Sequence, residues 1–302
     1  MDIKEIAILL ATYNGEKYIR EQLNSLINQS YKDFDIYIRD DGSSDDTVSI
    51  IKEYMLNDSR IHLEFGEHDG ACQNFARLLK KHNNYNYVMF CDQDDVWNKY
   101  KIEKSILKMK QCESEMENVL PILLYCDKEL VDEQLNRIDA ITYRYEDSLH
   151  SLLCQCHIYG CTMMLNKELM KLVDIPEYAS MHDHWIALVA AERGRIIKVE
   201  EKLILYRQHN NNVTGGMNQY SLINKIKNWN RINDKLMITL NMCYRYSELY
   251  QINGNVCLEK YNQMMKSRGI LRFIKALQFR YKLNRLSASL RGLYVLLRFK
   301  AK

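Results

Sequence analysis

Three aspartates close a strongly apolar segment of the sequence. The apolar run 88–91 leads directly into Asp92, Asp94 and Asp95. Burial and mutual repulsion both oppose ionised carboxylates at such a place, so a cation is needed to offset them. Mg²⁺ and Mn²⁺ prefer carboxylate oxygens and commonly keep phosphate oxygens as further ligands. The D-x-D spacing therefore favours a metal–diphosphate site, and the alternative is a solvated turn in which Asp94 or Asp95 caps the next helix.

Two earlier apolar segments also end in polar residues. The triplet Thr12-Tyr13-Asn14 closes the first segment, and the pair Asp40-Asp41 closes the second. The first segment is a continuous apolar run, which is typical of a strand buried inside a parallel sheet, and the second is a further expected strand. In open α/β folds, ligands bind beyond the carboxyl ends of such strands. We therefore expect three strands to deliver polar groups to one edge of a sheet.

Segments with helical spacing alternate with the apolar segments. Strands are expected within 5–15, 34–41, 61–66 and 86–92, and helices within 16–30, 45–56 and 70–82. Right-handed crossovers between them predict an α/β fold, with a mostly parallel central sheet and helices on both faces. The later pattern is looser. It predicts strands in 122–131, 159–166 and 195–209, a helix at 182–194, and two or three helices after residue 219.

Length and composition indicate a folded chain. Its 302 residues are 47% hydrophobic, which is enough to bury a sizeable core. The net charge of +3 does not argue for a nucleic-acid partner. The nine cysteines lack zinc-site spacing, so we expect reduced thiols. Because there is neither a secretory cleavage pattern nor an apolar run of about 18 residues, we expect a cytoplasmic chain that does not span the membrane.

The polar strand ends belong to motifs that occur in an order known from one family. The segments 7–47, 90–97 and 182–215 resemble family 2 glycosyltransferases of the GT-A fold, and in particular their rhamnosyltransferase-like branch. The resemblance covers roughly residues 3–216. It implies a metal-dependent, inverting transfer of a sugar from a nucleotide-diphosphate donor, with Mg²⁺ or Mn²⁺ as cofactor. We therefore expect a catalytic GT-A domain at 1–216 and a separate helical region at 217–302.

The resemblance also implies which residues bind the donor nucleotide. The ring of Tyr13 would stack on the base, Asp40 and Asp41 would accept hydrogen bonds from it, and Asp92 would contact the ribose or the metal. Ordinary turn and capping chemistry is the alternative role for the two earlier motifs, and a plain helix start for the segment around residue 70. The full expected set is Thr12, Tyr13, Asn14, Asp40, Asp41, Gly70, Asn74 and Asp92.

The metal and the catalytic base follow from the same resemblance. Asp94 would ligate the metal, together with Asp92 and His209. Asp183 matches the family's catalytic base, which removes the acceptor's proton as its hydroxyl attacks the anomeric carbon. The metal would stabilise the charge on the departing diphosphate. Because Asp183 opens an apolar helix, a helix cap is its alternative role.

Four more residues are candidate contacts for the diphosphate or the acceptor. Arg207 lies in the segment that the family places over the diphosphate. His182 would tune the base or bind the acceptor, and Trp185 is either a core residue or a platform for a sugar. Asp95 would support the metal site. The family branch often has Trp where His184 stands, which leaves the acceptor contact at that position open.

The C-terminal region is strongly basic. No acidic residue follows Glu259, while lysines and arginines alternate with apolar residues. This pattern predicts basic amphipathic helices on an anionic membrane surface. A helical hairpin packed on the catalytic domain is the main alternative, and nucleic-acid binding is a weaker one. The membrane interpretation suits an enzyme that acts on a lipid-linked glycan, peripherally at the inner face of the cell membrane.

The sequence thus predicts a glycosyltransferase of cell-surface polysaccharide synthesis. Its donor would be dTDP-rhamnose or a UDP-hexose, and its acceptor a hydroxyl of a lipid-linked glycan. A nucleotidyltransferase or pyrophosphorylase is the alternative enzyme, although the segment 9–18 lacks the glycine-rich phosphate loop expected there. A non-catalytic protein that binds nucleotide sugars at a membrane is the third interpretation. Retention of Asp92, Asp94 and Asp183 together argues against it.

Overall fold

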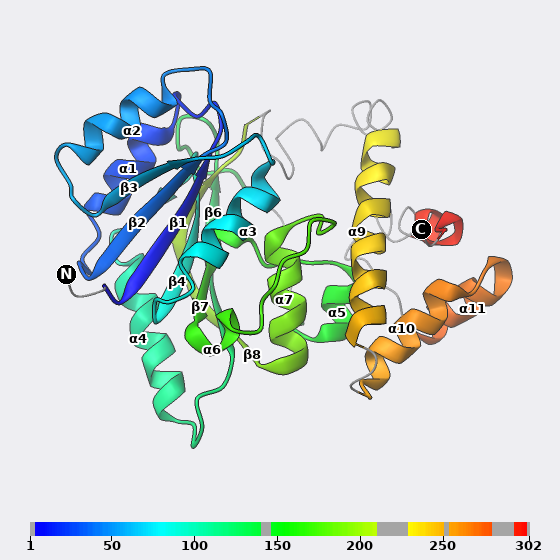
Figure 1. The fold of residues 1–302 in the computed structure, drawn as a ribbon. Helices are drawn as coiled ribbons and strands as arrows, with labels where there is room; N and C mark the ends of the chain where they lie inside the picture. Colours follow the sequence, from blue (N-terminus) through cyan, green and yellow to red (C-terminus); the bar gives the residue numbers. More distant parts are fainter. Residues whose placement is uncertain (1–3, 140–145, 210–228, 251–253, 280–292, 301–302) are drawn as a thin grey trace. The chain divides into compact units, whose positions relative to one another are not determined.

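A computed structural model describes residues 4–139, 146–209, 229–250, 254–279 and 293–300 (Figure 1). The chain divides into two compact units. The first comprises 1–141, 158–177 and 181–212, and the second comprises 142–157, 178–180 and 213–302. The second unit therefore takes two short earlier segments besides the C-terminal region. The domain division at residue 216 stays a prediction.

The first unit is built on an eight-stranded sheet with the order β3-β2-β1-β4-β7-β6-β8-β5. Strands β1 to β4 are mutually parallel, β6 is parallel to β8, and the pairs β4–β7, β6–β7 and β5–β8 are antiparallel. The predicted α/β class with a mostly parallel sheet is confirmed. The strands are β1 (Ile6–Thr12), β2 (Phe34–Asp40), β3 (Ile61–Phe65), β4 (Tyr87–Asp92), β5 (Val96–Trp97), β6 (Ile122–Val131), β7 (Met163–Asn166) and β8 (Arg195–Arg207).

Helices cover both faces of this sheet, which explains the unbroken apolar runs (Figure 1). Ile8 of β1 belongs to a buried cluster with Leu23 of α1 and Ile102 of α4. Side chains alternate along a strand, so neighbouring residues serve the other face. There, Phe90 of β4 meets Phe75 of α3 with 5.6 Å between ring centroids. The helices of this unit are α1 (Ile19–Ile27), α2 (Thr47–Met55), α3 (Ala71–Lys81), α4 (Lys101–Ser114), α6 (Lys167–Met170) and α7 (His182–Arg193).

The second unit is helical and more divided than predicted. Its described part contains α5 (Leu149–Cys154), α9 (Trp229–Tyr250), α10 (Val256–Lys266), α11 (Gly269–Gln278) and a helical turn at 293–298. The expectation of two or three helices after residue 219 missed the breaks. Asn255 caps α10 through its side chain, and Gly269 begins α11 with a φ of +53°. None of the helices described here is both long and apolar enough to cross a membrane.

Candidate active site

Strand register brings the predicted polar residues to one edge of the sheet. Thr12 at the end of β1 pairs with Asp40 at the end of β2. On the other side of β1, Ala11 pairs with Asp92 at the end of β4. Three neighbouring parallel strands therefore end in polar groups at the same edge, as the sequence predicted. The segment 93–97 and the first turn of α7 supply the remaining predicted carboxylates.

Asp40 is buried and fully engaged by its own chain. It is 1% exposed. One carboxylate oxygen accepts from the N–H groups of Gly42 and Ser43, at 3.2 and 2.8 Å. The other accepts from the hydroxyls of Thr12 and Ser43, at 3.0 and 2.5 Å. The turn role foreseen for this motif is therefore realised, and the contact with a nucleobase stays a prediction.

Asp41 anchors the loop that leads into α3. Its carboxylate accepts from the N–H groups of Asp69 and Gly70, at 3.0 and 2.7 Å. Gly70 has a φ of +80°, a left-handed conformation that favours glycine. Asn74, one turn into α3, is 1% exposed and donates to the carbonyl of Arg39 at 3.0 Å. Asn74 thereby holds α3 against β2, and its contact with the donor stays a prediction.

Tyr13 offers the open surface that base stacking requires. Its side chain is 45% exposed. The side-chain amide of Gln93 holds the backbone of Tyr13 through two hydrogen bonds. Its oxygen accepts from the Tyr13 N–H at 2.9 Å, and its nitrogen donates to the Tyr13 carbonyl at 3.0 Å. The ring of His68 lies 4.8 Å from that of Tyr13. Asn14 accepts from the Ser44 N–H at 2.8 Å and closes this end of the loop. His68 is a candidate base contact that the sequence analysis missed.

The D-x-D segment is short of positive charge. Ligand atoms of Asp92, Asp95 and Cys161 lie within 4.8 Å of one another. Asp95 is 0% exposed, and one of its carboxylate oxygens has no hydrogen-bond partner among the described residues. Desolvation, with the charges of Asp94 and Asp183, raises the pKa of Asp92 to about 7. Desolvation also raises the pKa of Asp95 well above its usual range. Such a cluster favours a bound cation.

Asp94 and His209 form the pair best suited to hold that cation. The His209 imidazole lies 2.7 Å from an Asp94 carboxylate oxygen, and His209 is 8% exposed. The carboxylate suits Mg²⁺ or Mn²⁺, and the imidazole is a further ligand of the kind that transition metals accept. The buried Cys161 thiol fits less well, because desolvation raises its pKa well above the usual range and a protonated thiol is a poor ligand. Asp92 lies two residues before Asp94, but its ligand atom clusters with those of Asp95 and Cys161. The predicted ligand set of Asp92, Asp94 and His209 therefore stays a prediction.

The structure places Arg207 differently from the predicted diphosphate contact. The side chain is 1% exposed. Its guanidinium donates to the carbonyls of Asp94 and Glu133, at 2.7 and 2.5 Å, and forms an ion pair with Glu21. It also stacks over the ring of Tyr18, 4.6 Å from the ring centroid. Arg207 therefore holds the backbone of the D-x-D segment through the Asp94 carbonyl. Its guanidinium nitrogens bind groups of the protein itself.

Asp183 is held by backbone N–H groups in the first turn of α7. Its carboxylate accepts from His184 at 2.7 Å and from Gly160 at 3.1 Å. The N-cap residue of α7 is Met181, so the alternative role as a helix cap is not realised. Desolvation raises the pKa of Asp183 to about 6. Because its charge also raises the pKa of Asp92, Asp183 shares one electrostatic site with the D-x-D segment.

The other candidate contacts are buried as well. His182 is 4% exposed and packs on Phe75 and Phe90, with 4.2 and 5.1 Å between ring centroids. Desolvation lowers its pKa to about 3, so it is neutral. Trp185 is 1% exposed and Asp95 is 0% exposed. Burial makes Trp185 a core residue. The expected role of His182 toward the base or the acceptor, and that of Asp95 beside the metal, stay predictions.

Lys128 is a charged residue of the site that the sequence analysis missed. Its ammonium lies 3.2 Å from the ring centroid of Tyr159 and 5.7 Å from that of Tyr206. Desolvation lowers the pKa of Lys128 to about 8. Its positive charge in turn lowers the pKa of Asp183. The only signal in the sequence was a lysine shortly after the apolar start of β6, between Asp127 and Glu129.

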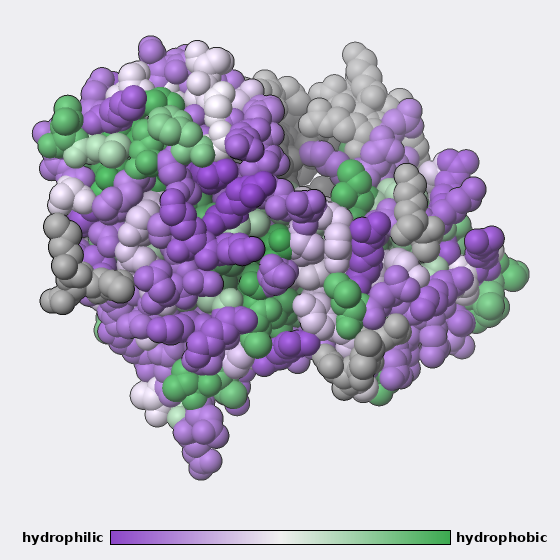
Figure 2. Space-filling model, viewed as in Figure 1, coloured by the Kyte–Doolittle hydropathy of each residue, from purple (hydrophilic) through white to green (hydrophobic). Residues whose placement is uncertain are grey.

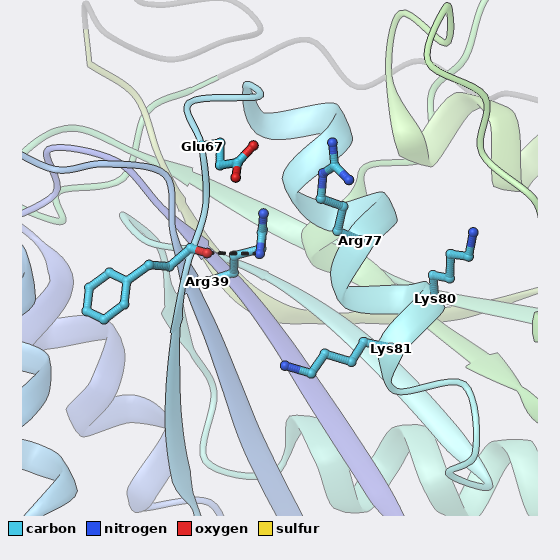
Figure 3. Close-up of a pocket in the computed structure, with 6 residues that line it drawn as sticks. Arg39, Glu67, Arg77, Lys80 and Lys81 are labelled. Carbon is cyan, nitrogen blue, oxygen red and sulfur yellow. Dashed lines mark hydrogen bonds between the residues drawn. The ribbon is translucent and has the colours of Figure 1, made fainter.

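A separate open pocket lies over β2 and α3. Its volume is about 540 Å³, and it contains none of the predicted site residues (Figure 3). Arg39 and Arg77 both pair with Asp69, at 3.6 and 2.6 Å, and Lys81 pairs with Glu64. These cations are therefore largely compensated. The lining residues are Arg39, Phe65, Glu67, Arg77, Lys80 and Lys81.

Comparison with known proteins identifies the family. Residues 7–171 match the family model described as glycosyl transferase family 2. The chain belongs to glycosyl transferase family 2. The match includes the strand ends of β1, β2 and β4 and the whole D-x-D segment. It favours the glycosyltransferase interpretation over the nucleotidyltransferase alternative.

Individual relatives extend this similarity beyond the matched residues. The dTDP-rhamnosyl transferase RfbG of Shigella flexneri is 33% identical over 224 residues, which cover 68% of this chain and 73% of the relative. An Escherichia coli protein, UDP-Glc:alpha-D-GlcNAc-diphosphoundecaprenol beta-1,3-glucosyltransferase WfgD, is 24% identical over 188 residues, with coverage of 62% and 70%. The glycosyltransferase described here thus resembles members with different donors.

Solved structures confirm the predicted GT-A-like architecture. TarS 1–349 of S. aureus, solved in complex with UDP, superposes with a TM-score of 0.57 at 18% identity. The superposition covers 92% of this chain and 88% of the TarS chain. At this level of identity the similarity concerns the fold alone.

Proposed function

We propose that this glycosyltransferase moves a sugar from a nucleotide-diphosphate donor to a hydroxyl of a lipid-linked glycan, with inversion at the anomeric carbon, in cell-surface polysaccharide synthesis. The 33% identity to a dTDP-rhamnosyl transferase supports dTDP-rhamnose as the donor, with a UDP-hexose as the second candidate. The diphosphoundecaprenol acceptor in the name of WfgD supports a lipid-linked acceptor.

One observation carries the proposal. The Asp183 carboxylate lies near enough to the D-x-D segment for its charge to raise the pKa of Asp92. An inverting transfer needs a base on one side of the sugar and a group that binds the leaving diphosphate on the other. A base works best when its pKa lies near the operating pH. The pKa of Asp183, about 6, meets that requirement.

The residues of the chain have separable roles in this mechanism. Asp183 accepts the proton of the acceptor hydroxyl, and the N–H groups of Gly160 and His184 keep its carboxylate in one orientation. Asp94 and His209, with Asp92, would hold Mg²⁺ or Mn²⁺. That ion, when bound, offsets the negative charge that develops on the leaving diphosphate.

The nucleotide would bind over the edge formed by β1 and β2. The exposed ring of Tyr13, beside His68, offers a stacking surface for the base. Asp40 and Asp41 shape the loops around it through their internal hydrogen bonds. In this proposal Thr12, Asn14, Gly70 and Asn74 complete that frame, Asn74 from inside the protein.

The same proposal assigns the rest of the chain. Residues 1–216 form the catalytic domain, and residues 217–302 form the region that associates with an anionic membrane surface. The enzyme would then act from the cytoplasm, peripherally at the inner face of the cell membrane. The excess of basic residues after Glu259 supports this arrangement.

A donor screen tests the proposal. The full chain with Mn²⁺ is incubated with dTDP-rhamnose, UDP-hexoses, UDP-N-acetylhexosamines and GDP-mannose, together with membrane lipid extract as the acceptor. We expect release of dTDP or UDP from one donor and a product whose NMR coupling shows the inverted anomer. No release from any donor, or a product with retained configuration, would contradict the proposal.

A further inference from the structure

Helix α11 turns its apolar side chains outward. Ile270, Leu271, Ile274 and Leu277 are 79, 51, 45 and 63% exposed. Their spacing of i, i+1, i+4 and i+7 places them along one side of the helix. In Figure 2, hydrophobic residues gather where Figure 1 draws α11. We call these four residues the α11 stripe.

The inward side of α11 carries an arginine. Arg272 is 2% exposed. Its guanidinium donates to the carbonyls of Leu296 at 2.8 Å, Phe299 at 2.5 Å and Met265 at 2.7 Å. It thereby holds α11 to the end of α10 and to the segment 293–299. A surface helix normally buries its apolar residues and exposes its arginines, so α11 has the reverse arrangement.

The charged side chains of α11 and of its N-cap residue are all basic. Arg268, at the start of α11, is exposed, and so are Arg298 and Lys300. Lys275 is half-buried and donates to the carbonyl of Gln263 at 3.2 Å. No carboxylate side chain occurs after Glu259 in the sequence. A partner for this surface must therefore accept aliphatic side chains and carry negative charge.

We propose that the α11 stripe docks on an anionic phospholipid bilayer. The proposal specifies the face through which the membrane association proposed above would occur, and it does not depend on the identity of the sugar. The ten residues of α11 span about 15 Å, too short to cross a bilayer but suited to lie in its interface. The aliphatic side chains would enter the acyl boundary while neighbouring cations meet lipid phosphates.

A bilayer fits the stripe better than a protein partner does. All four residues are aliphatic, and none offers a hydrogen-bonding or aromatic group of the kind that enriches protein interfaces. A helix that lies in the membrane interface needs only apolar side chains on one side and cations near the lipid headgroups. The α11 stripe with Arg268 meets both conditions.

Vesicle binding by the full chain tests the proposal. The variant Ile270→Gln/Ile274→Gln/Leu277→Gln is compared with wild type in co-sedimentation with phosphatidylglycerol-containing and pure phosphatidylcholine vesicles. We expect the variant to bind the anionic vesicles at least tenfold more weakly, and wild type to prefer them over neutral ones. The matched control, Leu56→Gln/Leu107→Gln/Ile238→Gln, alters the same number of aliphatic residues at positions 87, 61 and 52% exposed outside the stripe, and it should bind like wild type.

Two outcomes would overturn the inference. Equal binding of variant and wild type to anionic vesicles would remove the stripe as a lipid-docking face. Light scattering that shows a wild-type dimer, dissociated in the variant while vesicle binding is unchanged, would make the stripe a contact between two copies. Hydrolysis of the donor in solution separates this test from the proposed function, because it should be the same in variant and wild type.

Discussion

Two groups of aspartates close β2 and β4, the strands on either side of β1, and their surroundings differ. The Asp40 carboxylate accepts four hydrogen bonds from its own chain, and Asp41 accepts two backbone N–H groups. Asp95 has an oxygen without a described partner, and desolvation with neighbouring charges raises the pKa of Asp92. The first group is satisfied by the fold, whereas the second is the place where we propose a bound cation. Both groups lie at the end of a strand, so their position does not distinguish aspartates that support the fold from aspartates that bind a ligand. The surrounding hydrogen-bond donors make that distinction.

The difference begins in the sequence that follows each group. Asp40 and Asp41 precede a glycine and two serines, and these supply N–H and hydroxyl donors within one tight turn. Asp92 precedes Gln93, whose amide turns away to the backbone of Tyr13. The carboxylates after β4 therefore receive few local donors. A ligand can supply the interactions that these carboxylates do not receive from the chain.

The largest expected effect concerns Asp183. Asp183→Asn keeps the shape of the side chain but cannot take up the acceptor's proton, so turnover should fall roughly 10²- to 10⁴-fold. Affinity for the nucleotide diphosphate, measured by calorimetry, should change little. Asp58→Asn is the matched control, since Asp58 also accepts a backbone N–H, from Arg60, but in the turn before β3. Wild-type turnover of Asp183→Asn would remove it as the base.

The second prediction contrasts the two aspartate groups in stability. Asp41→Ala leaves the N–H groups of Asp69 and Gly70 without their acceptor, which should lower the free energy of unfolding by about 2 kcal/mol. Asp92→Asn should instead stabilise the metal-free chain at pH 8. The raised pKa of Asp92 means that ionising it costs stability in the folded state, and this cost disappears below about pH 4.

Urea unfolding at both pH values measures this contrast. The gain from Asp92→Asn should be present at pH 8 and absent near pH 4, and at pH 8 Asp41→Ala should show the opposite sign, a loss. If Asp92→Asn destabilised the metal-free chain at pH 8 as much as Asp41→Ala does, the two groups would be alike and the comparison would fail.

The smallest expected effect is a shift in the pH profile. Asp183 must be ionised to act as a base, so kcat/KM should rise with pH and reach half its plateau near pH 6. Lys128 favours the ionised form of Asp183. Removing that charge in Lys128→Met should move the acidic limb upward by about half a pH unit. Lys128→Arg, which keeps the charge, should leave the limb in place, and an identical profile for all three would exclude Lys128 from the site.

Much of the fold could be predicted from the sequence, because each apolar segment fitted only one kind of secondary structure. The runs at β1 and β4 are buried on both faces, whereas residues of β2 alternate between buried and half-buried. The polar residues that end all three strands mark the carboxyl edge of a parallel sheet. The resemblance to the family, rather than the apolar runs, predicted that Asp183 lies beside Asp92 and Asp94. The two-residue strand β5 and the breaks between the C-terminal helices were not predicted, since short elements depend on tertiary partners.

The orientation of individual side chains was harder to predict. Arg207 was expected to face the diphosphate, yet Glu21 and two carbonyls hold it inside the protein. Those partners come from distant segments of the chain. Lys128 and His68 were missed for the same reason, because their roles depend on Tyr159 and Tyr13. The outward face of α11 could not be read either, since an amphipathic pattern does not say which side is buried.

Calorimetry of nucleotide-diphosphate binding, with and without Mn²⁺, tests the central claim most directly. The claim is that the carboxylates after β4 form a site completed by a cation and a diphosphate. We predict that Mn²⁺ tightens binding of dTDP or UDP to the wild-type chain at least tenfold, and less than twofold to Asp94→Asn. Equal affinity of the wild-type chain with and without Mn²⁺ would contradict the account.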